Sequence, residues 1–385
     1  MRALWVMDHL GMPGGVIHGA TRYFLNVLPR LRPDRVKITL CFLGPHHPVE
    51  AELRSRGIEP LFFDRARWDP RALRDVWKLA HETRPHIMHL GGMKSMIIGR
   101  VVARTVGARA VIHLHDINHT PLPVTLMHRL LAPWTDLALG VSADAARHAA
   151  EVFHVPPARC VALPNGVPVE EFSHVPTLDR AAARRSLGVA PDARVVLVMG
   201  RLYPVKSQDL LVAHMPRIRQ RVPNATLLLV GHGPTRAALE AQAKALGQLG
   251  TGVIFTGQYL DLPGALAAAD LLALPTRTGE GLPMAALEAM SAARPVVAFR
   301  NGGMPEVVSH NETGLLAPPG NDDALADAVA DLLADPARCA ALGAAAAAAV
   351  QRFSIDEHVR TLQRLYDELV GSQEVPQTLA DAVAA

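Results

Sequence analysis

The chain has 385 residues, 49% hydrophobic and 19% charged, so it can bury large cores and is too long for one ordinary domain. Three widely separated cysteines exclude a disulfide scaffold and a zinc ribbon, and an aromatic content of only 4% argues against a stacking platform for single-stranded nucleic acid. The net charge of +3 conceals an asymmetry: residues 1–170 hold 21 Lys and Arg against 14 Asp and Glu, and residues 171–385 hold 18 against 22. A basic first half and a mildly acidic second half indicate two domains with different ligands.

The first half alternates short apolar segments with helical ones, of which the first helix runs from about Gly19 to Leu31. The apolar segments are Leu4–Met7, Lys37–Leu43, Leu61–Phe63, His86–Leu90, Ala110–Leu114 and Leu137–Val141. Such near-continuous apolar strands are typical of a parallel sheet buried on both faces, so we predict a doubly wound α/β domain. The apolar start is too short for a signal peptide, and no apolar run reaches the 18 residues that a membrane-spanning helix needs.

The same alternation of apolar strand segments and helical segments begins again after a Pro/Gly segment at Val161–Phe172. The new strands are Val195–Met199, Thr226–Val230, Val253–Phe255, Leu271–Leu274 and Val296–Ala298. We therefore predict two Rossmann-like domains, at residues 1–168 and 169–354. Residues 322–351 are Ala-rich helix material, a last helix occupies 355–370, and 371–385 form a tail.

In two such domains ligands bind at the carboxyl ends of the strands, so the loops there should carry function. The first loop contains Gly14 and Gly15, which would let the backbone approach an anion before a helix N-terminus. It is not a GxGxxG motif, which weakens a nicotinamide dinucleotide interpretation, and a plain tight turn is the alternative.

A histidine cluster ends the strand at Ala110–Leu114. His113 and His115 share one face because side chains alternate along a strand. Three interpretations stay open: a metal site completed by His119, a packed histidine pair, or His115 as a polar ligand for substrate. No carboxylate-rich partner motif accompanies the histidines, which weakens the metal site, and we favour the third interpretation, with His115 held toward the cleft by strand geometry.

A cationic loop follows the first strand of the second half. Gly200 comes directly before Arg201, and Lys206 lies five residues further on, before a helix. A guanidinium fork and an ammonium point charge suit a diphosphate. The alternative is that both residues are solvated surface cations without a ligand.

The segment Glu280-Gly281-Leu282-Pro283-Met284 is the most specific motif, with Glu288 eight residues after Glu280. Pro283 suits the first position of a helix, so backbone N–H groups at 282–284 would face an anion. Glu280 would then hold sugar hydroxyls and Glu288 a ribose. The alternative is a helix with one capping acid and one surface acid.

Glycine turns after other strands of the second half add weaker clues. They are Gly231 with Gly233, Gly257 before Gln258, and Gly302 with Gly303.

A basic stripe in the first half surrounds a helix that begins near Pro70. Its cations are Arg67, Arg71, Arg74 and Lys78, with Trp68, Leu73 and Trp77 nearby. The stripe would suit anionic lipid headgroups, or it is a solvated helix face.

These segments together resemble the retaining glycosyltransferases of family 4, which have the GT-B fold. The resemblance lies in GRLYPVKSQDLL, LLLVGHGP, TGQY, ADLLALPTRTGEGLPMAALEAMSAARPVVAFRNGGMPEVV and LPNGVPVEEF. It implies that Arg201 and Lys206 neutralise a diphosphate, that Glu280 contacts the donor sugar and that Glu288 contacts the ribose. It further implies that Gly14 and Gly15 approach the diphosphate, that Gln258 lies beside the base, that His115 contacts the sugar and that the last helix crosses back to the first domain.

The chain departs from the family pattern at the elbow, where the family often has Glu-Gly-Phe-Gly and this sequence has Glu-Gly-Leu-Pro. Pro283 removes one backbone N–H from the proposed anion site. The Arg201/Lys206 pair and the absence of an Asp-rich motif predict a site that works without a divalent metal or other cofactor.

We therefore expect a retaining hexosyltransferase that moves a sugar from a UDP- or GDP-sugar to a glycan, glycolipid or small-molecule hydroxyl. The alternatives are a GT-B-like nucleotide-sugar epimerase and a non-catalytic partner subunit. A role in polysaccharide biosynthesis and a cytoplasmic location are expected, with the inner face of the membrane as a candidate contact for the basic first domain. Nucleic-acid binding is not expected, because the basic residues are dispersed.

Overall fold

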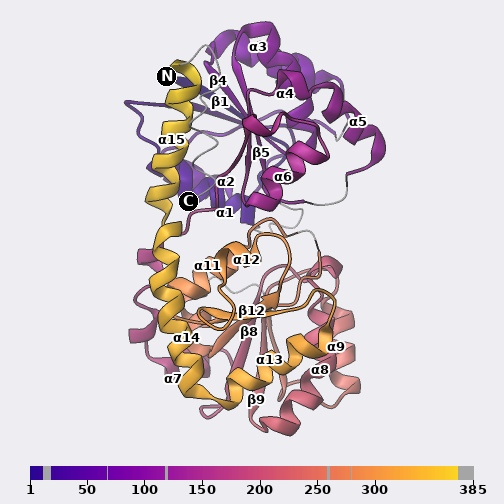
Figure 1. Ribbon diagram of the computed structural model, residues 1–385, viewed down its shortest axis with the longest axis vertical. Helices are drawn as coiled ribbons and strands as arrows, with labels where there is room; N and C mark the ends of the chain where they lie inside the picture. The colour runs from indigo at the N-terminus through magenta and orange to yellow at the C-terminus, as the bar shows by residue number, and fades with distance from the viewer. Residues whose placement is uncertain (12–18, 67, 118–119, 258–260, 279, 372–385) are drawn as a thin grey trace. The chain divides into compact units, whose positions relative to one another are not determined.

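A computed structural model describes residues 1–11, 19–66, 68–117, 120–257, 261–278 and 280–371. Contacts divide the chain into two compact units (Figure 1). Unit 1 comprises Met1–Gly166 and the segment from Ile355 onward, and unit 2 comprises Val167–Ser354. This boundary lies two residues before the one placed from the sequence, and the last helix extends to Gly371.

Unit 1 is built on a parallel seven-stranded sheet of order β3-β2-β1-β4-β5-β6-β7. The strands are β1 (Arg2–Met7), β2 (Lys37–Phe42), β3 (Leu61–Phe62), β4 (Ile87–Gly91), β5 (Arg109–Leu114), β6 (Leu137–Gly140) and β7 (Cys160–Ala162). Its helices are α1 (Gly19–Val27), α2 (Glu50–Ser55), α3 (Arg71–Thr83), α4 (Met93–Val106), α5 (Leu122–Leu130), α6 (Ala143–Glu151) and α15 (Ile355–Gly371), with the short helix η2 (Ala132–Trp134) after α5.

The apolar pattern of the strands determines how the helices cover this sheet. Alternate residues of β1, such as Trp5 and Met7, join side chains of α1, α2 and α15 in one buried cluster. Helices α3, α4 and α6 pack against the strands without joining that cluster, so they cover the other face. The sheet is thus buried on both faces, as its apolar strands predict.

Unit 2 repeats the plan with a parallel six-stranded sheet of order β10-β9-β8-β11-β12-β13. The strands are β8 (Arg194–Met199), β9 (Ala225–Val230), β10 (Val253–Gly257), β11 (Leu271–Leu274), β12 (Val296–Phe299) and β13 (Gly314–Ala317). The helices are α7 (Arg180–Ser186), α8 (Gln208–Arg221), α9 (Arg236–Ala245), α10 (Leu262–Ala268), α11 (Met284–Ser291), α12 (Met304–Val307), α13 (Asp322–Ala334) and α14 (Pro336–Ala349).

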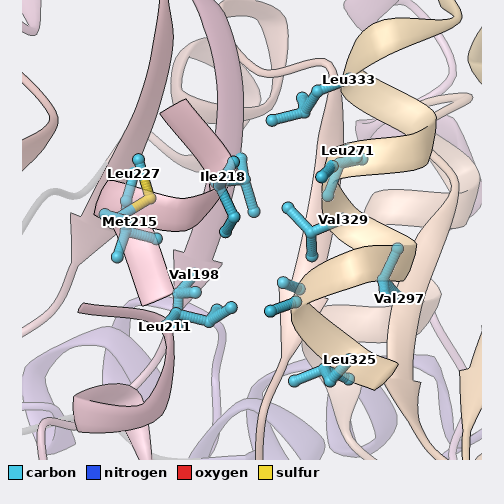
Figure 2. Close-up of a cluster of buried hydrophobic side chains, with 14 of the residues drawn as sticks. Val198, Leu211, Met215, Ile218, Leu227, Leu271, Val297, Leu325, Val329 and Leu333 are labelled. Atoms are coloured by element: carbon cyan, nitrogen blue, oxygen red, sulfur yellow. The ribbon is translucent and has the colours of Figure 1, made fainter. Parts of the chain in front are cut away.

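The core of unit 2 joins α8 and α13 over the sheet. Met215 and Ile218 of α8 meet Val329 and Leu333 of α13 above strand residues such as Leu227 (Figure 2). These side chains recur at helical spacing on each helix, which is why the sequence predicts both helices.

The structure confirms the doubly wound α/β fold and differs from the prediction in two features. Strands β7 and β13 were not expected, and each lies at an edge of its sheet. The Ala-rich segment is two helices, because Pro336 ends one and the Asp335 side chain caps the next by accepting from Arg338 N.

Within the described residues no single helix is long and apolar enough to cross a bilayer. The sharply bent pair at 322–334 and 336–353 reaches the required length and hydropathy only when both parts are counted together.

Each sheet reverses its strand order at one point, between β1 and β4 in unit 1 and between β8 and β11 in unit 2. The loops after these neighbouring strands diverge and leave room for a ligand. In unit 1 the backbone N–H groups at the start of α4, the helix that follows β4, already have a partner within the protein. The Asp8 carboxylate accepts hydrogen bonds from Lys94 N at 3.0 Å and from Ser95 N at 2.7 Å.

Candidate functional site

The candidate site lies in unit 2, where the strand order reverses. Lys206 lies in the loop after β8, and Glu280 in the loop after β11. Their side chains form an ion pair, although 74 residues separate them in the chain. The charge of Arg201 also acts on Lys206, so three of the predicted site residues come together.

The backbone around this site requires glycine. Gly200 and Gly231 follow the adjacent strands β8 and β9 with φ values of +141° and +152°, which other residues rarely adopt. A Cβ atom on Gly231 would overlap the carbonyl oxygen of Gly200. The two strand ends therefore approach more closely than side chains permit, which gives Gly231 a structural role in addition to the predicted ligand contact.

Lys206 and Glu280 are mostly buried, with side-chain exposures of 26% and 14%. Burial, and after it the positive charge of Arg201, lower the pKa of the Lys206 ammonium. The ion pair with Glu280 favours the charged form and opposes this shift, so we take Lys206 as protonated at neutral pH. The site thus concentrates positive charge where water is partly excluded.

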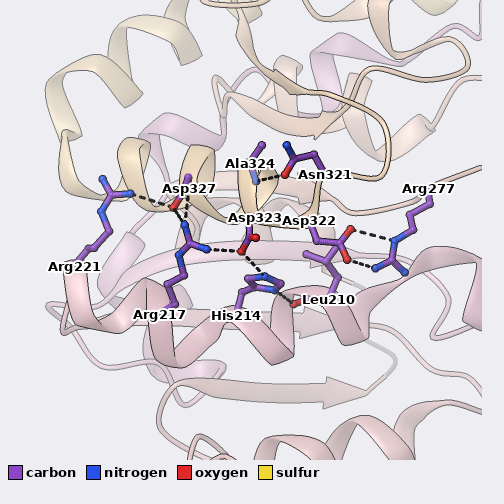
Figure 3. A network of polar contacts seen from close by, with 10 residues as sticks. All are labelled: Leu210, His214, Arg217, Arg221, Arg277, Asn321, Asp322, Asp323, Ala324 and Asp327. Carbon is purple, nitrogen blue, oxygen red and sulfur yellow. Dashed lines mark hydrogen bonds and ion pairs between the residues drawn. The ribbon is translucent and has the colours of Figure 1, made fainter.

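The loop that carries Glu280 is anchored on both sides. Thr276 Oγ1 donates to Glu280 Oε1 at 3.2 Å, and the Asn301 amide donates to the carbonyls of Thr276 and Arg277 at 3.0 and 2.7 Å. Arg277 forms an ion pair with Asp322 at the start of α13 (Figure 3). Sequence reasoning missed Thr276, although its place four residues before Glu280 at the end of a strand was a usable signal.

The glycine turn at 301–303 packs directly under this loop. Gly303 N donates to Gly281 O at 2.8 Å, and a Cβ atom on Gly302, whose φ is +51°, would overlap Glu280 O. The turn was a weak clue in the sequence, and the structure shows that it supports the Glu280 backbone.

Helix α11 begins one residue later than expected. Pro283 has helical φ but extended ψ (122°), so it is the N-cap and Met284 is the first helical residue. Leu282 and Met284 are buried, and Glu288 is only 4% exposed on the helix. The alternative in which Glu288 is a surface acid is therefore wrong; its contact with a ribose stays a prediction.

Several predicted residues lie outside the described part of the chain. They are Gly14, Gly15, Arg67, His119 and Gln258. The proposed contacts of these residues stay predictions. No group of three or more His, Cys, Asp or Glu side chains arranged to hold a metal ion occurs within the described ranges.

His115 lies in unit 1, directly after β5, and is half-buried. Its ring is 4.8 Å from that of Tyr23 and 4.2 Å from that of His113, measured between ring centroids. The two histidines share one face, as strand geometry predicts. His113 belongs to the packed interior, whereas His115 keeps partial exposure and stays our candidate for contact with substrate.

His113 is part of a buried polar network beneath α15. His89 Nε2 lies 3.1 Å from His113 Nδ1, and Tyr366 OH lies 2.6 Å from His89 Nδ1. His358 Nε2 contacts Tyr23 OH at 3.0 Å, and its Nδ1 donates to Pro164 O at 2.7 Å. Two side chains of α15 thus hydrogen-bond to the core of unit 1, as the resemblance implied for the last helix.

We expect the burial of these histidines to make the stability of unit 1 sensitive to acid. Burial lowers the pKa of His358 to about 4 and those of His89 and His113 well below 6.5. The unfolded chain binds protons below about pH 6.5 while the folded rings stay neutral, so stability is complete above pH 6.5 and falls toward pH 4. Each buried histidine should cost about 1.4 kcal/mol per pH unit in that window.

We expect a steep fall in the melting temperature between pH 7 and pH 5, followed by circular dichroism. In His358→Gln the number of protons taken up on unfolding at pH 5 should drop by about one. An unchanged pH dependence in that variant would show that His358 does not titrate as described.

Two sequence families match this chain. The family described as "Glycosyl transferases group 1" matches residues 193–335, and "Glycosyltransferase Family 4" matches residues 17–171. A relative from Mycolicibacterium smegmatis, a "GDP-mannose-dependent alpha-(1-6)-phosphatidylinositol monomannoside mannosyltransferase", is 38% identical over 257 residues, which cover 63% of this chain and 66% of the relative. The match thus spans just under two thirds of that protein's length.

A second relative and a solved structure agree with these matches. The "GDP-mannose-dependent monoacylated alpha-(1-6)-phosphatidylinositol monomannoside mannosyltransferase" of Corynebacterium glutamicum is 35% identical over 261 residues, covering 65% of this chain and 67% of the relative. The crystal structure of Anabaena Alr3699/HepE in complex with UDP superposes with a TM-score of 0.83 at 24% identity, covering 95% of this chain and all of that one. At that identity the likeness establishes the fold.

Proposed function

The chain belongs to glycosyltransferase family 4 and has the GT-B fold, and from this premise we propose that it transfers a hexosyl group from a nucleoside-diphosphate sugar to an acceptor hydroxyl. The observation that carries the proposal is the cationic site at the strand reversal of unit 2, where Lys206 and Glu280 form an ion pair beside Arg201.

We propose GDP-mannose as the donor and a glycolipid as the acceptor. The names of both relatives specify a GDP-mannose-dependent enzyme acting on a phosphatidylinositol mannoside. A UDP-sugar is the competing donor, because the structurally similar Anabaena protein was crystallised with UDP.

The chemistry follows from charge. As the bond between sugar and diphosphate breaks, negative charge grows on the leaving group, and Arg201 and Lys206 stabilise that charge more than they stabilise the intact donor. Lys206 is held by Glu280 before the donor arrives. In the proposed complex Lys206 turns toward the diphosphate, and the freed Glu280 carboxylate accepts hydrogen bonds from sugar hydroxyls.

The remaining assignments are part of the same proposal. Glu288 contacts the ribose, Gln258 lies beside the base, Gly14 and Gly15 approach the diphosphate, and His115 contacts the transferred sugar. Transfer with retention, independence from a divalent metal and a cytoplasmic location are proposed on the family resemblance.

A thermal-shift panel with GDP, UDP, ADP, dTDP and NAD, each with and without magnesium, tests the donor site. GDP at about a hundred times its Kd should add about 2.7 kcal/mol of stability, or roughly 5–10 °C, without magnesium. Arg201→Ala should lose this shift, and Arg185→Ala, a change at an exposed arginine of α7, should keep it. A response to NAD alone, or to none of the diphosphates, would refute the proposal.

A further inference from the structure

Helix α5 of unit 1 has its polar side inward and its apolar side outward. Its buried side chains are Thr125 and His128. Five large apolar side chains on α5 and η2 are between 42% and 72% exposed, and we call them the α5 face: Leu122, Leu126, Met127, Leu130 and Trp134. The spacing of four, one and three residues places the first four on one side of α5, and Trp134 follows in η2.

The inward side is held by polar contacts. The buried Arg100 guanidinium of α4 lies 2.7 Å from His128 Nδ1 and donates to Thr135 Oγ1 at 3.1 Å. The His128 ring stacks on Phe153 at 4.2 Å. Folding therefore orients α5 through polar groups and leaves its leucines in water, so the α5 face contributes little to the stability of unit 1.

The size of the α5 face is that of a functional patch. Its exposed fractions correspond to about 500 Å² of apolar surface. A standard protein interface buries about 800 Å² on each partner, a little over half of it apolar, so the area alone would suit a second copy of the chain or a membrane. The charge around the face and the residue types in it decide between these occupants, because apolar area and charge attraction act together on a lipid surface.

The surrounding charge fits an anionic partner. Of the five Lys and Arg between residues 93 and 135, Lys94 and Arg100 are buried and Arg109 pairs with Asp136. The remaining two are Arg104, which is exposed on α4, and Arg129, which is partly exposed on α5, and the stretch contains a single acid, Asp116. Helix α3, which also packs on α4, exposes Leu73 and Trp77 beside Arg74 and Lys78. Trp134 ends the α5 face, and tryptophan favours the boundary between lipid and water.

We propose that the α5 face inserts shallowly into the surface of an anionic bilayer and attaches unit 1 to it, with α3 as the neighbouring basic contact. Leucine side chains of α5 enter the headgroup boundary, and the exposed cations Arg74 and Lys78 of α3 and Arg104 of α4 face lipid phosphates. This inference goes beyond the proposed transferase activity, since attachment needs neither donor nor acceptor.

Vesicle flotation with the full chain tests the proposal. The protein should float with vesicles of equal parts phosphatidylglycerol and phosphatidylcholine, and less with phosphatidylcholine alone. Leu126→Glu/Leu130→Glu should weaken binding by at least about tenfold. Leu249→Glu, at a leucine of unit 2 that is 43% exposed, is the matched control and should bind as the parent does.

Two outcomes would refute the proposal that the α5 face binds membranes. Equal binding by the double variant and the parent would refute it, as would a concentration-dependent dimer that the double variant abolishes without any vesicle binding. Leu122→Ser/Leu130→Ser repeats the test without added charge, should the glutamates unfold the protein. The GDP thermal shift should survive in both double variants, so loss of vesicle binding is distinguishable from failure of the donor site.

Discussion

Lys206→Ala is expected to lower kcat/KM for sugar transfer by about 10²- to 10³-fold, the usual cost of removing one preorganised charge from a transition state. The ammonium is mostly buried and is held by Glu280. Its removal withdraws stabilisation from the leaving diphosphate and leaves a buried carboxylate without its cation. Steady-state kinetics with GDP-mannose and UDP-glucose, each with a glycolipid acceptor, measure the effect.

Two further variants separate charge from folding. Lys244→Ala, which removes an exposed lysine of α9, should keep full activity and stability. Glu280→Gln tests whether the carboxylate holds Lys206, and its effect should be non-additive with that of Lys206→Ala, because the two groups act as a pair. Additive losses would contradict the pairing, and an active Lys206→Ala enzyme would remove Lys206 from the mechanism.

Gly231→Ala is expected to have the largest effect on stability, at roughly 3 kcal/mol or more. The added Cβ overlaps the backbone oxygen of Gly200, and backbone, unlike a flexible side chain, cannot move aside cheaply. The alanine must also adopt a φ of +152°. The ends of β8 and β9 should separate, so the variant should lose the GDP thermal shift as well as melting temperature.

Gly247→Ala is the matched control for this experiment. Gly247 has a φ of +67° with nothing near its Cβ position, so it carries the backbone penalty without the overlap. It should lose only about 1–2 kcal/mol and keep the GDP response. Chemical denaturation of the three proteins compares them, and equal losses in both variants would show that the close approach of the strand ends does not matter.

Much of the fold could be predicted from the hydrophobic pattern of short sequence segments. Buried strands such as Val195–Met199 are apolar throughout, and helices such as α13 repeat leucine and valine at helical spacing. Both signals lie within short windows, so the sequence predicts two parallel sheets without knowing how they are ordered. Strand β7 was missed because it has only three residues, of which Val161 alone is buried, whereas β13 was missed although all four of its residues are buried.

The sequence predicts the motifs of the candidate site but not the contacts between them. The Arg201/Lys206 loop and the Glu280 elbow each stand out as strand-end motifs, but the spacing says nothing about their contact across 74 residues. That contact follows from the strand order, which makes β8 and β11 neighbours. The same holds for Thr276 and Asn301, whose supporting hydrogen bonds depend on how two loops fold together.

The sequence by itself therefore determined the fold class, the family and the residue types of the candidate site, because these depend on periodicity and on motifs within one loop. Only the tertiary structure decided which loops meet, that Glu288 is buried, that α15 hydrogen-bonds to the histidines of unit 1, and that α5 shows its leucines to solvent. The helical spacing of α5 is the same whichever side faces inward. Its orientation is decided by Arg100, a residue of another helix that binds the polar side.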